Sequence, residues 1–360
     1  MLLYVRDKSF KKIGRPIRAT SVVWLRKAKE EGQIAFTVDA TSEMLGMLKQ
    51  DYYITRDDDE MVGVIKQLTI NTDAETDINE LQVVCVDVLS ILDTRILYKM
   101  KTFSGSVELA IRELIEENFI NPIDSNGEEY LSRQIPIILG DLANISDVFD
   151  VELPVGTNIG ETIKTWCLTY DICIKVIRDA DKWKVVLYKG TNRSISQMDN
   201  PIVEFSDQFH NVKTTQYIMD CSNAKNMALV GGEEIEGVDR LFVKINDGFS
   251  GLERKEIFVD ASSLKQENDD GNRIPDDTYK SIITQYGVDQ LSEYVTSESF
   301  ACDIINTKIF NYKKHYELGD IVTTRSEYGL LFNARVVQVK EAYDDNGLDI
   351  TLTLEYREVN

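Results

Sequence analysis

The sequence contains few of the residues that form covalent cross-links or metal sites. It has five cysteines in 360 residues. They show no Cys-x-x-Cys pair and no metal-ligand spacing, and they are Cys85, Cys167, Cys173, Cys221 and Cys302. Their odd number and their apolar or small neighbours predict reduced, partly buried thiols rather than a disulfide framework.

Long apolar runs are also lacking. No stretch of about 18 apolar residues occurs, so the sequence predicts no membrane-spanning helix. The N-terminus, Met1 to Lys8, lacks the apolar centre of a signal peptide. We therefore expect the protein to be made and folded in the cytosol.

Basic residues are outnumbered, with 40 lysines and arginines against 61 acidic side chains and a net charge of −21. The absence of a basic stripe disfavours tight nucleic-acid binding by counterion release. One interpretation of the charge is simple solubility. The other is an acidic surface that repels a polyanion passing close by, and the sequence does not place the charges.

The chain has two histidines, and neither predicts a catalytic site. His210 follows Phe209 at an expected strand edge, and His315 ends the basic cluster that begins at Lys313. Neither lies in a defensible arrangement with serine or cysteine and a carboxylate. We expect structural or solvent-exposed roles for both, and we predict no catalytic, cofactor-binding or metal-binding residue and no cofactor.

Two other patterns imitate ligand sites. Asp73, Glu75, Asp77 and Asn79 imitate a calcium loop, but its sixth position holds isoleucine and its twelfth valine, so an acidic hairpin turn is the preferred interpretation. Several aromatic residues could stack on sugars, although packing within sheets is expected because aromatics are enriched in strands. They are Tyr52, Tyr53, Trp183, Tyr312 and Tyr316.

Alternation and short apolar runs predict two strand-rich regions, one from Val22 to about Leu97 and one from Pro201 to the end. Between them, Ser104 is the predicted cap of one helix, and Asn158 with Glu161 is the predicted capping box of a second. A hairpin is expected to follow over residues 172–188. Later elements are a helix over 278–295 and a hairpin at Asp344 to Gly347.

The stretch from Tyr188 to Ser206 joins a strand, a polar turn and a second strand. Gly190 is expected to permit the backbone dihedral angles of a sharp turn at the end of the first strand. Arg193 is expected to be either an ion-pair partner near a domain junction or an ordinary surface arginine. Further on, Gly319 and Asp320 predict a turn into the next strand, with Leu318 anchored in the core.

The order of several motifs resembles that of the Gp37-like family of siphophage tail proteins, which is related to the baseplate hub and tail-associated proteins of tailed phages. The resemblance covers nearly the whole chain. Its elements are Ser21 to Arg26 with Gly32, Met61 to Ile65, Leu92 to Arg95, Tyr188 to Ser194 with Asn200-Pro201 and Phe205-Ser206, and Tyr316 to Val322.

The resemblance implies a mainly β fold with α+β insertions, in which two tube-like antiparallel β-barrel domains carry smaller inserted domains. We expect the first barrel at 1–102, an inserted α+β domain at 103–190, the second barrel at 191–262 and 301–360, and a loop and helix insertion at 263–300. It further implies a homotrimer, whose lumen would let DNA pass as cargo.

On this basis we predict a non-enzymatic structural protein, the baseplate hub or tail tip of a phage, prophage or phage-tail-like particle. It would join the tail tube or distal tail ring to the tip and form a channel as a trimer. Expected partners are the distal tail or tail tube protein, the tip, spike or receptor-binding proteins and the tape measure protein. The expected location is the virion, after assembly in the host cytoplasm. The alternatives are a carbohydrate-binding adhesion module and a cell-wall hydrolase.

Overall fold

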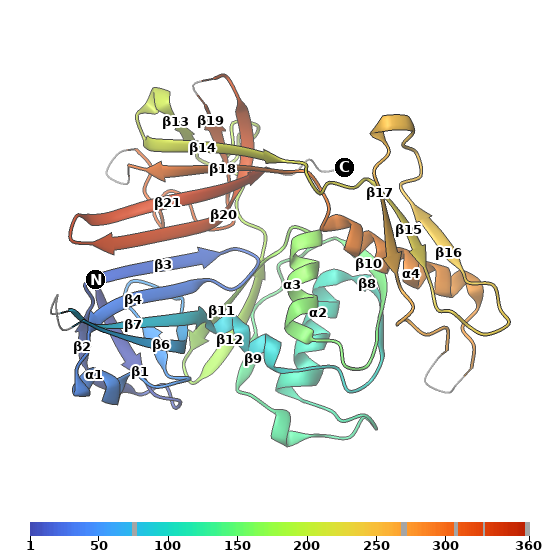
Figure 1. The fold of residues 1–360 in the computed structure, drawn as a ribbon, viewed down its shortest axis with the longest axis horizontal. Coiled ribbons are helices and arrows are strands. Elements are labelled where there is room, and N and C mark those ends of the chain that lie inside the picture. Colours follow the sequence, from blue (N-terminus) through green and yellow to red (C-terminus); the bar gives the residue numbers. More distant parts are fainter. Residues whose placement is uncertain (74–77, 268–271, 306–308, 327, 357–360) are drawn as a thin grey trace. The chain divides into compact units, whose positions relative to one another are not determined.

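The computed structural model describes the chain except residues 74–77, 268–271, 306–308, 327 and 357–360. Its backbone contacts divide it into two compact units, each formed by segments far apart in the sequence (Figure 1). Unit 1 consists of Met1–Ile91, Cys173–Ile218 and Ser299–Asn360. Unit 2 consists of Leu92–Ile172 and Met219–Glu298. The fold is mainly β with several sheets, as predicted.

The largest sheet has 13 strands, in the order β14-β18-β21-β20-β3-β4-β7-β6-β5-β1-β2, with β19 beside β20 and β13 beside β19. Its N-terminal strands are β1 (Leu2–Arg6), β2 (Lys12–Arg18), β3 (Ser21–Lys27), β4 (Gln33–Asp39), β5 (Tyr53–Thr55), β6 (Gly63–Asp73) and β7 (Ile78–Asp87). The others are β13 (Glu204–Ser206), β14 (Val212–Asp220), β18 (Ser297–Ile304), β19 (Ile321–Arg325), β20 (Leu331–Asp344) and β21 (Gly347–Tyr356).

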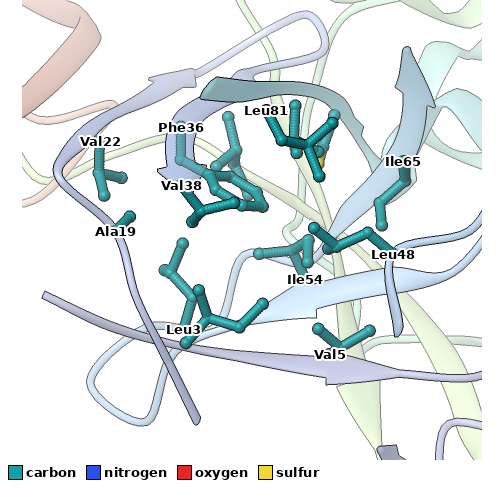
Figure 2. Close-up of a cluster of buried hydrophobic side chains, with 14 of the residues drawn as sticks. Leu3, Val5, Ala19, Val22, Phe36, Val38, Leu48, Ile54, Ile65 and Leu81 are labelled. Atoms are coloured by element: carbon teal, nitrogen blue, oxygen red, sulfur yellow. The ribbon is translucent and has the colours of Figure 1, made fainter. Parts of the chain in front are cut away.

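Strand periodicity explains the core of the N-terminal half. Successive side chains of a strand point to opposite faces, so alternate residues of β3 and β4 are buried. Leu3, Phe36, Ile54 and Leu81 come together in one apolar cluster (Figure 2). The helix α1 (Ser42–Met47) adds Met47 to it.

The C-terminal half has a second apolar cluster, which includes Phe205, Tyr316, Val336 and Leu352. The rings of Phe205 and Tyr316 meet edge to face with centroids 5.2 Å apart. The predicted hairpin joins β20 to β21, and Gly347 occupies its turn with a φ of 118°, a conformation that favours glycine. In the described part of the chain the strand order does not close on itself, so the two barrels remain a prediction.

Unit 2 combines helices with short sheets. Its first segment contains β8 (Lys101–Ser106), α2 (Val107–Ile115), a π-helical turn (Glu116–Ile120), β9 (Ile137–Leu139), β10 (Val148–Leu153) and α3 (Ile159–Thr169). Its second segment contains β15 (Met227–Gly231), β16 (Phe242–Ile245), β17 (Glu256–Asp260) and α4 (Asp276–Ser292). The helix α4 packs on the sheet β16-β15-β17, and together they bury Val230, Ile245, Val259, Tyr279 and Ile283.

Short 3-10 helices complete the chain, at Val88–Thr94, Leu131–Arg133, Asp207–Phe209 and Gly251–Glu253. The expected domain limits remain a prediction, and the two units group some elements differently. The hairpin of β11 (Cys173–Asp179) and β12 (Lys182–Tyr188) was expected in the insert at 103–190, but it belongs to unit 1. The strands β15, β16 and β17, expected within the second barrel, belong to unit 2 because they form their own sheet under α4.

The cap of α2 differs from the predicted residue. Ser106 is the N-cap, and its side chain accepts a hydrogen bond from the Leu109 N–H. Ser104 lies within β8, two residues earlier, because β8 pairs with β10 as far as Ser106. The cap of α3 is Asn158, as predicted, and its Oδ1 accepts a bond from the Glu161 N–H at 3.1 Å.

Replacement of Ser106 by alanine tests this assignment. The Ser106→Ala variant should lose about 1 kcal/mol of unfolding free energy, because a helix N–H loses its partner. The exposed Ser104 supplies a matched control, and Ser104→Ala should change the value by less than about 0.5 kcal/mol. Urea unfolding followed by circular dichroism measures both. Equal losses would contradict the cap at Ser106.

A buried carboxyl in unit 2 makes stability depend on pH. Burial raises the pKa of Asp289 to about 7, and the Gln285 side chain donates to its Oδ1 at 2.9 Å. Between pH 4 and 7 the folded state therefore holds a proton that the unfolded state lacks, so stability falls as the pH rises through this window.

We expect the wild-type protein to lose on the order of 2 kcal/mol more unfolding free energy than Asp289→Asn between pH 5 and 8. The asparagine keeps an acceptor for Gln285 and removes the titration. Urea unfolding at the two pH values measures the difference. Parallel pH profiles for the two proteins would show that Asp289 does not titrate in this range.

Candidate functional site at the seam between two half-sheets

The strands β3 and β20 join the N-terminal and C-terminal strands of unit 1. They pair antiparallel over six residue pairs, from Lys27 opposite Gln338 to Val22 opposite Tyr343. Trp24 lies opposite Glu341 in this register, and both side chains are buried. β3 belongs to the N-terminal strands and β20 to the C-terminal strands, so their pairing joins the two groups of strands into one sheet.

Five charged side chains meet at this seam. Arg26 comes from β3, Glu341 from β20, Arg56 and Asp59 from the segment between β5 and β6, and Lys313 from the segment between β18 and β19. Arg26 Nη2 lies 3.3 Å from Glu341 Oε2, and Arg56 Nη2 lies 3.2 Å from Asp59 Oδ2. Arg26 also contacts Asp59, and Arg56 contacts Glu341. We call these five residues the seam cluster.

Three cations share two carboxylates in the seam cluster. Lys313 Nζ donates to Asp59 Oδ2 at 2.6 Å and to the Asp58 carbonyl at 2.7 Å. Burial, together with the charges of Arg26 and Arg56, lowers the pKa of Lys313 to about 8. Because opposite charges in a low-dielectric interior must be paired, each of the four segments depends on the others.

Aromatic rings surround the cations. The Arg56 guanidinium lies 4.8 Å from the ring centroid of Trp24, and that of Arg26 lies 5.5 Å from that of Tyr312. Such contacts favour a cation over the negative face of the ring. Burial raises the pKa of Tyr312 to about 12, so this side chain stays neutral and adds no charge to the seam.

Local sequence patterns do not predict the seam cluster. Asp59 lies in the acidic run from Asp57 to Glu60, which is typical of a surface turn, and Arg26 was noted only as the end of a family motif. One signal was present, because Arg26 continues the alternate positions of Val22 and Trp24, which form the buried face of β3. An arginine in that position requires a buried carboxylate partner. The identity of the partners was not readable, since Glu341 is 315 residues away.

A second arrangement in unit 1 involves the stretch from Tyr188 to Ser206. Asp320 is buried, and its carboxylate accepts from the Thr191 N–H at 2.7 Å, the Glu317 N–H at 3.0 Å and Arg193 Nε at 2.8 Å. Of the two roles weighed for Arg193, the structure shows the ion pair. Leu318 packs against the C-terminal core as predicted.

Gly190 has a different role from the predicted one. It does not adopt a positive φ, and a Cβ on it would lie 2.0 Å from the Gly319 carbonyl oxygen. Glycine is required here because two backbone segments approach closely, and not because the chain turns sharply. Tyr188 to Ser206 therefore docks on the turn before β19.

The histidines and aromatic residues that were weighed as possible site residues have structural surroundings. His315 Nδ1 accepts from the Asn311 N–H at 2.9 Å, and His210 is an exposed residue with a φ of 49° that ends a 3-10 helix. The rings of Tyr53 and Trp183 lie 5.3 Å apart, and those of Tyr312 and Tyr316 lie 5.7 Å apart, as expected for packing within the fold.

The calcium-like pattern falls on a hairpin. Asp73 pairs with Ile78 across β6 and β7, while Glu75 and Asp77 lie outside the described residues. Among the described residues no group of three or more histidine, cysteine or acidic side chains could hold a metal ion. Four cysteines are buried as predicted, but Cys221 is exposed. No helix in the described ranges is long and apolar enough to cross a membrane.

The fold is that of phage tail proteins. The 43 kDa tail protein of prophage MuSo2 from Shewanella oneidensis has a TM-score of 0.59 at 10% identity, over 98% of each chain. The prophage tail protein gp18 from Listeria monocytogenes EGD-e has a TM-score of 0.54 at 14% identity, over 100% of this chain and 96% of the other. The tail protein from Neisseria meningitidis MC58 has a TM-score of 0.55 at 12% identity, over 99% and 96%.

The family model of the Siphovirus ReqiPepy6 Gp37-like protein matches residues 2–354. The chain belongs to this family, which confirms the predicted resemblance. No curated protein sequence matches the chain.

Removal of Asp59 tests the seam cluster. The Asp59→Ala variant removes a carboxylate that the buried Arg26 and Arg56 share with the partly exposed Lys313, so we expect a loss of about 3 to 5 kcal/mol of unfolding free energy, measured by urea unfolding. The adjacent Glu60 supplies the control, because its exposed carboxylate pairs with Lys175 at 2.7 Å. Glu60→Ala should cost less than about 1 kcal/mol. Similar small losses for both variants would show that the seam cluster does not hold the half-sheets together.

Proposed function

We propose that the protein is a non-enzymatic structural component of a phage, prophage or phage-tail-like particle, namely its baseplate hub or tail tip. Membership of the Gp37-like family over residues 2–354 supports a role in the tail. The observation on which the hub assignment depends is the continuous sheet of unit 1, in which β3 and β20 join two half-sheets with separate apolar cores.

The two half-sheets correspond, in this proposal, to the two tube-like domains. The first domain is built around the cluster of Leu3 and Phe36, and the second around the cluster of Phe205 and Leu352. The segments Leu92–Ile172 and Met219–Glu298 of unit 2 would be insertions into these two domains. Three copies would present six similar domains to a hexameric tail tube or distal tail ring.

The seam cluster supports a mechanical role. In this proposal the seam cluster keeps the two domains in one register, because a slip of β3 along β20 would separate buried arginines from their carboxylates. The predicted partners are the distal tail or tail tube protein, the tip, spike or receptor-binding proteins and the tape measure protein. The protein would be part of the virion at the tail tip after synthesis in the host cytoplasm.

The acidic composition agrees with a channel for DNA. A lumen lined by carboxylates would repel phosphates and let the genome slide without binding. DNA is therefore proposed as passing cargo and not as a ligand. The net charge of −21 supports this interpretation, together with solubility.

Mass measurement in solution combined with negative-stain imaging tests the proposal. We expect a species of three times 41.1 kDa and ring-shaped particles with a central hole. Several protein concentrations are needed, since an interface between copies forms only above its dissociation constant. A monomer that cleaves or retains wall polysaccharide would contradict the hub and favour the hydrolase or the adhesion module.

A further inference from the structure

The large sheet of unit 1 has several open edges in the described part of the chain, those of β2 and β13 included, and β14 and β6 are two of the strands that have one. β14 stands at one end of the strand order. β6 pairs with β5 only through Gly63 and Val64, so beyond Ile65 its outer edge has no neighbouring strand in the described part of the chain. An open edge presents backbone N–H and C=O groups that can pair with another chain.

These edges are not protected in the usual way. Proteins commonly shield edge strands with central charges, proline or short length. β6 exposes Leu68 and Ile70, which are 36% and 51% exposed, and β14 exposes Ile218, which is 45% exposed. Between Lys66 and Asp73 the strand β6 has no charged residue and no proline.

The backbone of β6 directs alternate residues to its open edge. The Asp87 N–H donates to the Gly32 carbonyl on the β4 side of β7, so every second residue of β7 before Asp87 bonds to β4. The residues between them, such as Gln82, bond to β6. Gln82 pairs with Thr69, so the backbone groups of Thr69 bond inward to β7. Those of the neighbouring Leu68 and Ile70 therefore point outward to the open edge.

The same alternation applies to β14. The Asn211 carbonyl accepts from the Ile305 N–H on the β18 side. Successive residues of a strand point their backbone groups to opposite sides, so Thr214, Gln216 and Ile218 direct theirs to the open edge. Each edge thus offers outward groups at every second residue.

Charge selects one antiparallel register between the two edges. Lys66 and Asp73 are seven residues apart at the ends of the exposed part of β6, and Lys213 and Asp220 are seven residues apart on β14. Antiparallel pairing places Lys66 opposite Asp220 and Asp73 opposite Lys213. Lys66 and Lys213 already pair with exposed carboxylates of their own chain, and surface pairs of this kind exchange at little cost.

The same register brings together the residues with outward backbone groups, namely Leu68 with Ile218, Ile70 with Gln216 and Thr72 with Thr214. We propose that β14 of one copy pairs antiparallel with β6 of a second copy in this register. The contact is between different edges, so it is head to tail and can close a ring. The inference rests on the self-assembly in the proposed function and assigns its interface.

A cysteine pair tests the register. Asn71 and Thr215 are exposed and would form a non-hydrogen-bonded pair with Cα atoms about 4.5 Å apart, within reach of a disulfide. Asn71→Cys with Thr215→Cys, in a Cys221→Ser background that removes the exposed native thiol, should give covalent dimers and trimers after mild oxidation. Non-reducing electrophoresis measures them.

The matched control moves one cysteine by one position. In Asn71→Cys with Gln216→Cys the two side chains would lie on opposite faces, so at least tenfold less cross-linking is expected. Equal cross-linking in both proteins would overturn the register. A wild-type trimer without cross-linking in the first protein would overturn the pairing but leave the hub intact.

Two further results separate the inference from the proposed function. A covalent ladder longer than three copies would support the pairing and contradict the trimer, whereas a wild-type protein that stays monomeric at all concentrations would overturn both.

Leu68→Pro removes one outward N–H, and it should raise the dissociation constant at least tenfold compared with Leu68→Ala, which keeps the N–H. Equal constants for these two variants would contradict backbone pairing at this edge.

Discussion

The pairing of β3 with β20 is the contact on which the rest of unit 1 depends. Without it, the strands of residues 2–87 and those of residues 204–356 would be two separate sheets with separate cores. Backbone hydrogen bonds alone do not fix such a pairing, since a strand can slip along its neighbour. The seam cluster supplies the missing specificity, because a slip of one residue would move Glu341 to the other face and leave Arg26 and Arg56 buried without it.

Buried ion pairs are weak evidence for stability, because desolvation offsets much of their attraction. Here they contribute specificity, because an alternative strand pairing would leave charged side chains without partners. Two carboxylates satisfy cations from three segments that are distant in sequence, so loss of either carboxylate leaves an excess of positive charge at the seam. The Asp320 carboxylate acts in the same way on a smaller scale, since it accepts from the Glu317 N–H of its own segment and from Thr191 and Arg193 of the stretch after β12.

Local patterns in the sequence predicted most strands, the hairpin at Gly347 and the Asn158 cap, because these depend on neighbours within a few residues. The predictions were wrong or incomplete where contacts with residues distant in sequence determine the structure. Ser104 was predicted as the cap, but the pairing of β8 with β10, a strand distant in sequence, continues as far as Ser106 and places the cap there. Gly190 was assigned to a turn because its contact with Gly319 is invisible in sequence. The partners of Arg26 were unreadable for the same reason, although its place on the buried face of β3 was evident.

The seam and the open edges are connected by the geometry of one sheet. Strands in a sheet twist relative to their neighbours, and the angle between the two ends of the sheet is the sum of these twists. The open edge of β6 and that of β14 lie on opposite sides of the β3–β20 pair in the strand order. If copies join through these edges, the number that closes a ring is determined by that accumulated angle. A residue of the seam cluster can then influence assembly without touching a second copy, because a change in the pairing of β3 with β20 reorients one edge relative to the other.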